Sequence, residues 1–248
     1  MDMIRRILDS RVYDVALQTP LDPMVRLSQR LSRKVLLKRE DLQPVFSFKI
    51  RGAYNRIARL SEEAKAKGVI CASAGNHAQG VALSGKKLGI KATIVMPVTT
   101  PAIKIDAVRY WGGQVVLFGD TFDEAYAHAR QLEAEQGLTF VHPYDDEDVI
   151  AGQGTIAIEL LRQAPDLDAV FIATGGGGLM SGIGSCLRHF APRAEIIGCW
   201  PENSAVLYRC LQADRLMEVR ETATLSESTA GGVEAGSITF EKSVRKFI

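Results

Sequence analysis

A lysine between two large apolar residues is the first feature that could carry chemistry. Lys49 lies in the stretch "SFKIRG", after Phe48 and before Ile50, where Ser47 and the apolar spacing downstream predict the start of a helix. Apolar neighbours and the positive end of a helix both disfavour an ammonium, so this amine is expected to lose its proton easily. A neutral lysine amine can form a Schiff base with a carbonyl compound. The alternative is an ordinary, solvated helix lysine.

Four consecutive glycines follow a predicted strand in the stretch "ATGGGGLMSG", residues 173–182. Residues without Cβ let backbone N–H groups converge on an anion, and the N-terminus of the helix expected next adds its positive dipole end. The stretch has neither the GxGxxG dinucleotide fingerprint nor the Gly-Lys-Ser/Thr ending of a Walker loop. It predicts a phosphate cradle, although the residues alone do not say whose phosphate. The alternative is a plain glycine-rich turn.

A third candidate is the strand-to-helix turn "CASAGNHAQG", residues 71–80. Small residues and several side-chain donors at a helix start suit a bound carboxylate. The residues concerned are Ser73, Gly75, Asn76, His77 and Gln79. Helix capping by Ser73 and Asn76 explains the same pattern equally well.

The elements that must position these residues follow from hydrophobic patterning. Apolar runs of strand length alternate with amphipathic stretches of helix length, which predicts βαβ units and parallel sheets. Most of the runs are short and β-branched, as is typical of strands buried on both faces. The expected strands are 35–38, 69–73, 92–97, 114–118, 139–142, 169–174 and 195–199.

Helix boundaries are also marked in the sequence. Thr121 with Glu124 predicts a capping box, and Gly137 predicts the end of the same helix. Thr100, which precedes a proline, predicts another helix start. The strands within residues 69–142 form one continuous block that could be a small domain, and the flanking segments are expected to share a larger sheet.

Composition excludes several classes of partner. The 248 residues carry 30 basic and 29 acidic side chains, a formal charge of +1, without a long run of one sign. A nucleic-acid footprint and a polybasic membrane patch are therefore disfavoured, and a small-molecule partner is expected. The four cysteines lack metal-like spacing, so reduced thiols and no metal site are expected. No apolar run reaches membrane-spanning length and no signal-peptide core is visible, which favours a cytoplasmic protein.

Together these stretches resemble one known family. "SFKIRGA", "SAGNHAQGVA", "IAGQGTIAIEL" and "TGGGGLMSG" are similar, in order and spacing, to the catalytic domain of threonine dehydratases (threonine ammonia-lyases). These belong to the fold type II pyridoxal-phosphate enzymes, as do serine dehydratases and serine racemases. The resemblance runs from about Tyr13 to Phe240. It implies an α/β chain of two three-layer αβα domains with mainly parallel sheets. The large domain would comprise residues 1–42 and 143–248, with its C-terminal part missing, and the small domain residues 43–142.

The same resemblance implies a role for each site residue. Lys49 would hold pyridoxal 5'-phosphate as a Schiff base, with Phe48 beside the cofactor ring, and Asn76 would bond the 3′ oxygen of the cofactor. The turn that receives the substrate carboxylate would consist of Ser73, Ala74, Gly75, Asn76 and His77. Backbone amides would bind the phosphate at Gly175, Gly176, Gly177, Gly178 and Leu179.

The reaction implied is the dehydration and deamination of L-threonine, and of L-serine, to 2-oxobutanoate or pyruvate and ammonia. Serine racemases carry a serine at the position of Ala74, and a methyl group cannot transfer a proton, so racemisation is expected to be poor. The family also implies a homo-oligomer, a dimer or tetramer. The main alternative is a shortened, non-catalytic member that binds the cofactor or a partner. Another hydroxy-amino-acid dehydratase or a β-replacement enzyme such as a cysteine synthase is less favoured, and a nicotinamide dehydrogenase least.

Overall fold

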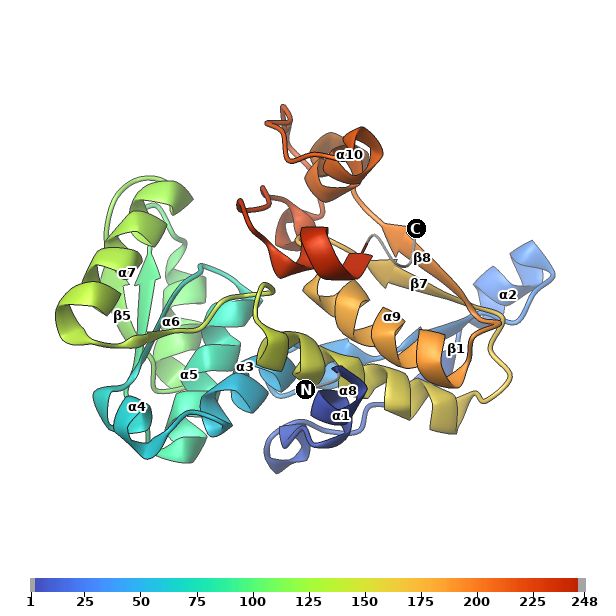
Figure 1. Cartoon of the computed structure of the whole chain (residues 1–248), viewed down its shortest axis with the longest axis horizontal. Helices are drawn as coiled ribbons and strands as arrows, with labels where there is room; N and C mark the ends of the chain where they lie inside the picture. The colour runs from blue at the N-terminus through green and yellow to red at the C-terminus, as the bar shows by residue number, and fades with distance from the viewer. Residues whose placement is uncertain (1–2, 245–248) are drawn as a thin grey trace.

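The computed structural model describes residues 3–244, which form two lobes joined through helix α3 (Lys49–Ala58) (Figure 1). One lobe contains a four-stranded, wholly parallel sheet in the order β5-β4-β3-β6. Its strands are β3 (Val69–Ala72), β4 (Ala92–Met96), β5 (Gln114–Leu117) and β6 (Thr139–Phe140). All of them were expected from the sequence. Three end one residue earlier than expected and β6 ends two residues earlier, although the Val141 peptide N–H still donates to the Ile70 carbonyl of β3.

Successive residues of the buried strands face opposite helical layers. Val69 and Cys71 belong to a core shared with α3, α5 and α6, whereas Ile70 and Ala72 belong to a core shared with α7. This period of two, with both faces covered, is the reason that β3 reads as a continuous apolar run. The helices are α3 (Lys49–Ala58), α4 (Glu62–Lys67), α5 (Asn76–Leu88), α6 (Ala102–Tyr110) and α7 (Phe122–Gln136). The lobe therefore has three layers.

The other lobe is built around a parallel strand pair and two helices that cross closely (Figure 1). Its elements are α1 (Met3–Leu8), α8 (Glu147–Gln163), β7 (Ala169–Ala173), α9 (Gly178–Phe190), β8 (Glu195–Cys199) and α10 (Val206–Ala213). Glycines permit the α8–α9 crossing, because a Cβ at Gly182 would lie 2.3 Å from the Ile150 carbonyl oxygen. The expectation of double burial is wrong for β7, since Phe171 is 70% exposed.

The N-terminal segment differs from the expectation of one larger shared sheet. Strand β2 (Leu36–Lys38) pairs with β1 (Leu21–Pro23), a strand that the sequence did not predict, and the pairing is antiparallel. Within residues 3–244 this hairpin shares no sheet with β7 and β8. Helix α2 (Val25–Leu31) lies between its two strands in the chain. Strand β1 has only three residues, too few for an alternating pattern to be recognised in the sequence.

The remaining elements are short turns of helix. They are η1 (Val12–Asp14), η2 (Glu40–Leu42), η3 (Glu202–Ser204), η4 (Glu227–Thr229) and the π-helical turn η5 (Thr239–Ser243). Among the described residues, no helix has both the length and the apolarity needed to cross a membrane.

Two of the three predicted helix boundaries are confirmed. Thr121 and Glu124 form the complete capping box of α7, and Gly137 ends that helix in the left-handed conformation. The prediction for Thr100 is wrong, because the extended Pro101 occupies the N-cap position of α6 itself. The Thr100 hydroxyl is thus one residue too early to cap the helix, and within the described residues it is buried without a hydrogen-bond partner.

Candidate active site

The Lys49 side chain points into the protein from the first residue of α3. Its Nζ donates a hydrogen bond to the Pro143 carbonyl oxygen at 2.8 Å and lies 5.5 Å from the centre of the Phe48 ring. Within the described residues no carboxylate pairs with this amine. Desolvation by burial lowers the pKa of Lys49 from 10.5 to about 8. The inference of an easily deprotonated amine agrees with this environment.

The expected capping role of Ser47 needs correction. Its hydroxyl accepts a bond from the Lys49 peptide N–H at 3.3 Å, but the N-cap of α3 is Phe48, which caps through no side-chain bond. Helix α3 therefore begins at Lys49 itself, so the reactive side chain lies in the first turn, near the positive end of the helix.

The loop from Ser73 to Asn76 leaves the carboxyl end of β3 and opens α5. Its residues are partly exposed, and the Ser73 hydroxyl accepts a bond from the Gly75 peptide N–H at 3.2 Å. Gly75 is the N-cap of α5 and no side chain caps this helix, so the capping interpretation of Ser73 and Asn76 is wrong. Among the described residues the Asn76 carboxamide makes no hydrogen bond. Its donor and acceptor atoms are free for a ligand.

His77 is the buried member of this loop, with only 3% of the residue exposed. Its Nε2 lies 2.8 Å from the Val141 carbonyl oxygen, and because a carbonyl only accepts, Nε2 carries the proton. Burial first, and then the charge of Lys49, lower the pKa of His77 to about 3, so the ring is neutral. Since the imidazole is bonded to Val141, a substrate carboxylate could be received only by the His77 peptide N–H.

The glycine loop connects β7 to α9 and is lined by backbone. Gly177 has a φ of +91° and caps α9, whose first residue is Gly178. A Cβ at Gly176 would lie 2.5 Å from the Tyr144 ring, and one at Gly178 would lie 2.7 Å from the Tyr144 carbonyl oxygen. Side chains are therefore excluded here by the close approach of Tyr144, and the backbone amides of the loop lie at the N-terminus of α9, where an anion is favoured. Leu179 follows in the first turn of α9 and is partly buried.

One turn, residues 141–145, contacts all three predicted motifs. The Val141 carbonyl meets His77, the Pro143 carbonyl meets Lys49, and Tyr144 packs on the glycine loop. From the sequence a strand is expected to end at His142, and the residue types of 141–145 indicate no role in the site. The available signal was their position directly after a parallel strand: the 73–76 loop follows β3 of the same sheet, and the glycine loop follows β7 of the other sheet.

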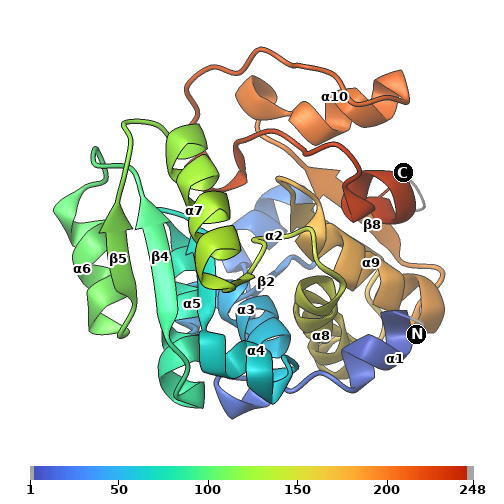
Figure 2. The same ribbon diagram turned by 60° about the vertical axis from the view of Figure 1, so that its left-hand side comes forward.

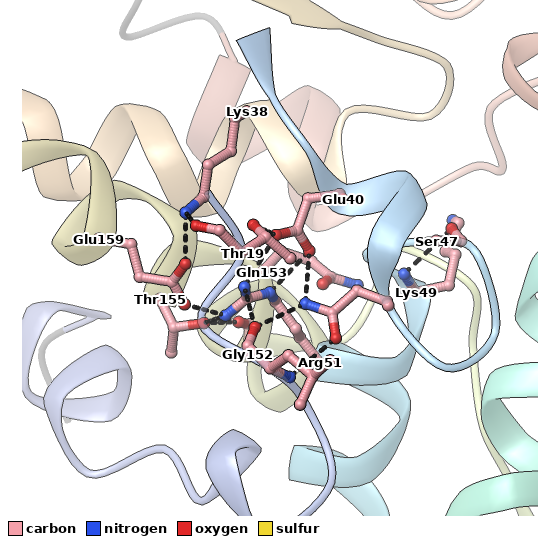
Figure 3. A network of polar contacts seen from close by, with 12 residues as sticks. Thr19, Lys38, Glu40, Ser47, Lys49, Arg51, Gly152, Gln153, Thr155 and Glu159 are labelled. Carbon is pink, nitrogen blue, oxygen red and sulfur yellow. Dashed lines mark hydrogen bonds and ion pairs between the residues drawn. The ribbon is translucent and has the colours of Figure 1, made fainter. Parts of the chain in front are cut away.

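A buried ion network surrounds Arg51, two residues after Lys49, and was not predicted from the sequence (Figure 3). Arg51, whose side chain is fully buried, donates to Glu159 at 2.6 Å and to both carboxylate oxygens of Glu40 at 2.8 Å. Glu159, equally buried, also accepts from Lys38 Nζ at 2.5 Å and from the Tyr13 hydroxyl at 2.8 Å. The network ties the helix that begins with Lys49 to α8 and to the N-terminal segment.

Comparison with known proteins identifies the family. Residues 12–247 match the family described as "Pyridoxal-phosphate dependent enzyme". The chain belongs to this family. The resemblance inferred from the motifs is thus confirmed. Pyridoxal phosphate is the cofactor of this family.

Individual relatives show which members of this family the chain is similar to. The chain is 51% identical over 233 residues to the biosynthetic L-threonine dehydratase of Burkholderia multivorans, a match that covers 92% of this chain and 46% of that protein. It therefore spans about half the length of the curated relatives it matches.

Solved structures agree with the predicted fold. The processed form of threonine deaminase isoform 2 from Solanum lycopersicum matches with a TM-score of 0.93 and 49% identity, over 96% of this chain and 69% of that one. Maize serine racemase matches with a TM-score of 0.93 and 30% identity, over 99% of this chain and 74% of that one. The prediction of a fold type II α/β architecture with mainly parallel sheets is confirmed.

The described residues fit a cofactor that carries an aldehyde and a phosphate. An amine of lowered pKa is available to the aldehyde, and a loop without side chains at a helix N-terminus is available to the phosphate. The Asn76 carboxamide, which makes no hydrogen bond among the described residues, can bond a polar ring substituent. The 141–145 turn links the amine to the loop.

The lowered pKa of Lys49 predicts how its capture of pyridoxal phosphate depends on pH. Only the neutral amine attacks a carbonyl carbon, so the rate should rise through a midpoint at about pH 8 rather than at the ordinary lysine value of 10.5. Mixing the chain with the cofactor at a series of pH values and following the visible band of the bound form measures this midpoint. A midpoint near pH 10 would show that the amine is solvated.

Proposed function

We propose that this chain carries the catalytic part of a lyase that dehydrates and deaminates L-threonine to 2-oxobutanoate and ammonia. L-Serine would give pyruvate and ammonia in the same manner. The observation that carries the proposal is the Lys49 amine, which is desolvated, has no carboxylate partner within residues 3–244 and donates to the Pro143 carbonyl, next to the Tyr144 that packs on the glycine loop. The names of the relatives support the substrate class, since a bacterial relative 51% identical and a plant relative 55% identical to this chain are both named threonine dehydratases.

Different site residues would bind the cofactor and the substrate. Lys49 would hold the cofactor covalently, Phe48 would pack beside its ring and Asn76 would bond its 3′ oxygen. The loop of Ser73, Ala74 and Gly75, with the peptide N–H groups of Asn76 and His77, would receive the substrate carboxylate at the start of α5. The phosphate would be held by the backbone amides of Gly175, Gly176, Gly177, Gly178 and Leu179.

The reaction needs a base at the α-carbon of the substrate. Bound pyridoxal phosphate withdraws electrons from that carbon, which makes its proton removable. The amine of Lys49, once the incoming substrate amine has released it, would take the proton at Nζ. The Pro143 carbonyl oxygen, already in hydrogen-bonding contact with Nζ, would hold the resulting ammonium in place while the β-hydroxyl leaves.

Elimination rather than racemisation follows from Ala74. Racemisation needs a proton donor on the face of the substrate opposite Lys49, and the Ala74 methyl group has no transferable proton. His77 cannot replace it through Nε2, because that N–H is bonded to the Val141 carbonyl.

The proposal also covers the domain division, the assembly and the location of the protein. We infer a division into a large domain of residues 1–42 and 143–248 and a small domain of residues 43–142. We also infer assembly as a dimer or tetramer and a cytoplasmic location. The close crossing of α3 with α8 supports a tight junction between these parts, since a Cβ at Gly152 would lie 2.7 Å from the Arg51 carbonyl oxygen.

The deciding experiment follows keto-acid release by the purified chain in the presence of pyridoxal phosphate. We expect 2-oxobutanoate from L-threonine and pyruvate from L-serine, with no interconversion of L- and D-serine. Cofactor binding without any keto acid would replace this proposal with the non-catalytic alternative. Formation of D-serine from L-serine would contradict the role given to Ala74.

A further inference from the structure

The chain crosses from one lobe to the other a second time after α10. Figure 2 shows it running across to α7 and then back to the helical turn at the end of the described residues. We call the returning part, residues 226–237, the strap. It lies on the glycine loop, because a Cβ at Gly175 would lie 2.9 Å from the Thr229 carbonyl oxygen, and the Tyr144 hydroxyl donates to the Gly232 carbonyl at 3.3 Å.

Glu234 attaches the strap to the opposite lobe. One of its carboxylate oxygens accepts from the Tyr126 hydroxyl of α7 at 3.2 Å, and the other lies 3.1 Å from His142 Nε2. The ion pair between Glu227 of the strap and Lys104 spans 3.5 Å at the surface, with 82% of the Glu227 side chain exposed. Exposed pairs of this kind contribute about 0–1 kcal/mol. Glu234 is half-exposed but makes two contacts, and the buried Ser237 also joins the strap to the 141–145 turn by donating to Asp145 at 2.8 Å.

The tautomer of His142 is fixed by its own turn. Nδ1 accepts hydrogen bonds from the peptide N–H groups of Asp145 at 2.7 Å and Tyr144 at 3.3 Å. Nδ1 is therefore unprotonated, and Nε2 carries the proton that is donated to Glu234. Glu234 thus orients an imidazole that in turn holds two amides of the 141–145 turn.

That turn presents the Pro143 carbonyl to the Lys49 amine. Pro143 follows His142 directly and precedes the two amides that the imidazole holds, so a rotation of the His142 ring would move the carbonyl that Lys49 contacts. We propose that Glu234 is a positioning residue: through His142 it fixes the carbonyl that holds the Lys49 amine, and it latches the strap over the glycine loop. This inference rests on the proposed role of Lys49.

The test compares Glu234→Ala, Glu234→Gln and the matched strap variant Glu227→Ala. Glutamine keeps an oxygen that accepts from His142, whereas alanine leaves that N–H without its partner. Glu234→Ala should raise the dissociation constant for pyridoxal phosphate, followed by its visible band, by about tenfold or more. Glu234→Gln should stay within about threefold of wild type, and Glu227→Ala should bind as wild type does.

Hydrogen exchange in the cofactor-free protein tests the latch separately. In Glu234→Ala the amides of Tyr144 and Asp145 and those of the strap should exchange about tenfold faster, with global unfolding unchanged. Unaltered exchange and unaltered cofactor affinity in Glu234→Ala would overturn the inference, as would equal effects of Glu227→Ala. Failure of wild-type chain to capture the cofactor would count against the proposed function alone, because the exchange measurement would still decide the latch.

Discussion

Replacing Lys49 with alanine should abolish the visible band of the chain mixed with pyridoxal phosphate and remove keto-acid release from L-threonine. The band requires a carbon–nitrogen double bond to an amine, and the methyl group of alanine supplies neither that amine nor a base for the α-carbon. Loss of general-base catalysis alone lowers a rate by about 10²–10⁴-fold. Absorption spectra and keto-acid assays on the same preparation measure both effects.

Two further variants show whether the effect belongs to this one amine. Lys49→Arg keeps a positive charge and a long side chain but cannot lose its proton, so it should be as inactive as Lys49→Ala. Lys67 is paired with Glu63 on the surface, and Lys67→Ala should retain the full band and activity. If the band survived in Lys49→Ala, another lysine would hold the cofactor and the site described above would be misassigned.

Local signals in the sequence predicted local structure well. The capping box of Thr121 with Glu124 and the left-handed stop at Gly137 depend only on residues within one helix, and both are confirmed. Strand β1 was missed because its partner β2 lies beyond an intervening helix, and nothing within Leu21–Pro23 alternates long enough to be recognised. The pairing is decided by tertiary contacts.

The site was predictable only in part, for the same reason. Lys49 and the glycine loop stand out because their residue types are unusual where they occur. The 141–145 turn does not, because it acts through the carbonyl oxygens of Val141 and Pro143, and every residue has a carbonyl. Its importance comes from what approaches it in the folded chain. For His77 the residue type indicated a polar contact, but not that burial would commit the ring to the protein itself.

The sequence is a poor guide to which charged side chains are buried, as Arg51 illustrates. In the sequence it is an ordinary helix arginine, two residues beyond Lys49, and solvation is the usual fate of such a side chain. In the structure it is fully buried among Glu40, Glu159 and Lys38, a set whose formal charges cancel. Burial acts to raise the pKa of Glu159, but the hydrogen bonds and charge of Arg51, with the bond from Lys38, outweigh it and hold that pKa below its usual value.

A balanced buried network makes the loss of one member costly. Glu159→Ala would leave the guanidinium of Arg51 and the ammonium of Lys38 facing each other with Glu40 as the one remaining carboxylate of the four-charge set. Removing one partner from a buried ion pair typically costs about 3–5 kcal/mol, because the other charge stays desolvated. We expect Glu159→Ala to lower the free energy of unfolding by this amount, measured by urea titration followed by circular dichroism.

Two control variants show whether the loss of stability comes from burial of the unpaired charges or from the loss of a carboxylate as such. Glu63→Ala removes a carboxylate of the same charge from an exposed pair with Lys67 and should cost at most about 1 kcal/mol. Replacing Arg51 and Glu159 together with methionine and leucine removes both charges, and should recover much of the loss because neither is left unpaired. A cost of Glu159→Ala as small as that of Glu63→Ala would mean that water reaches the network.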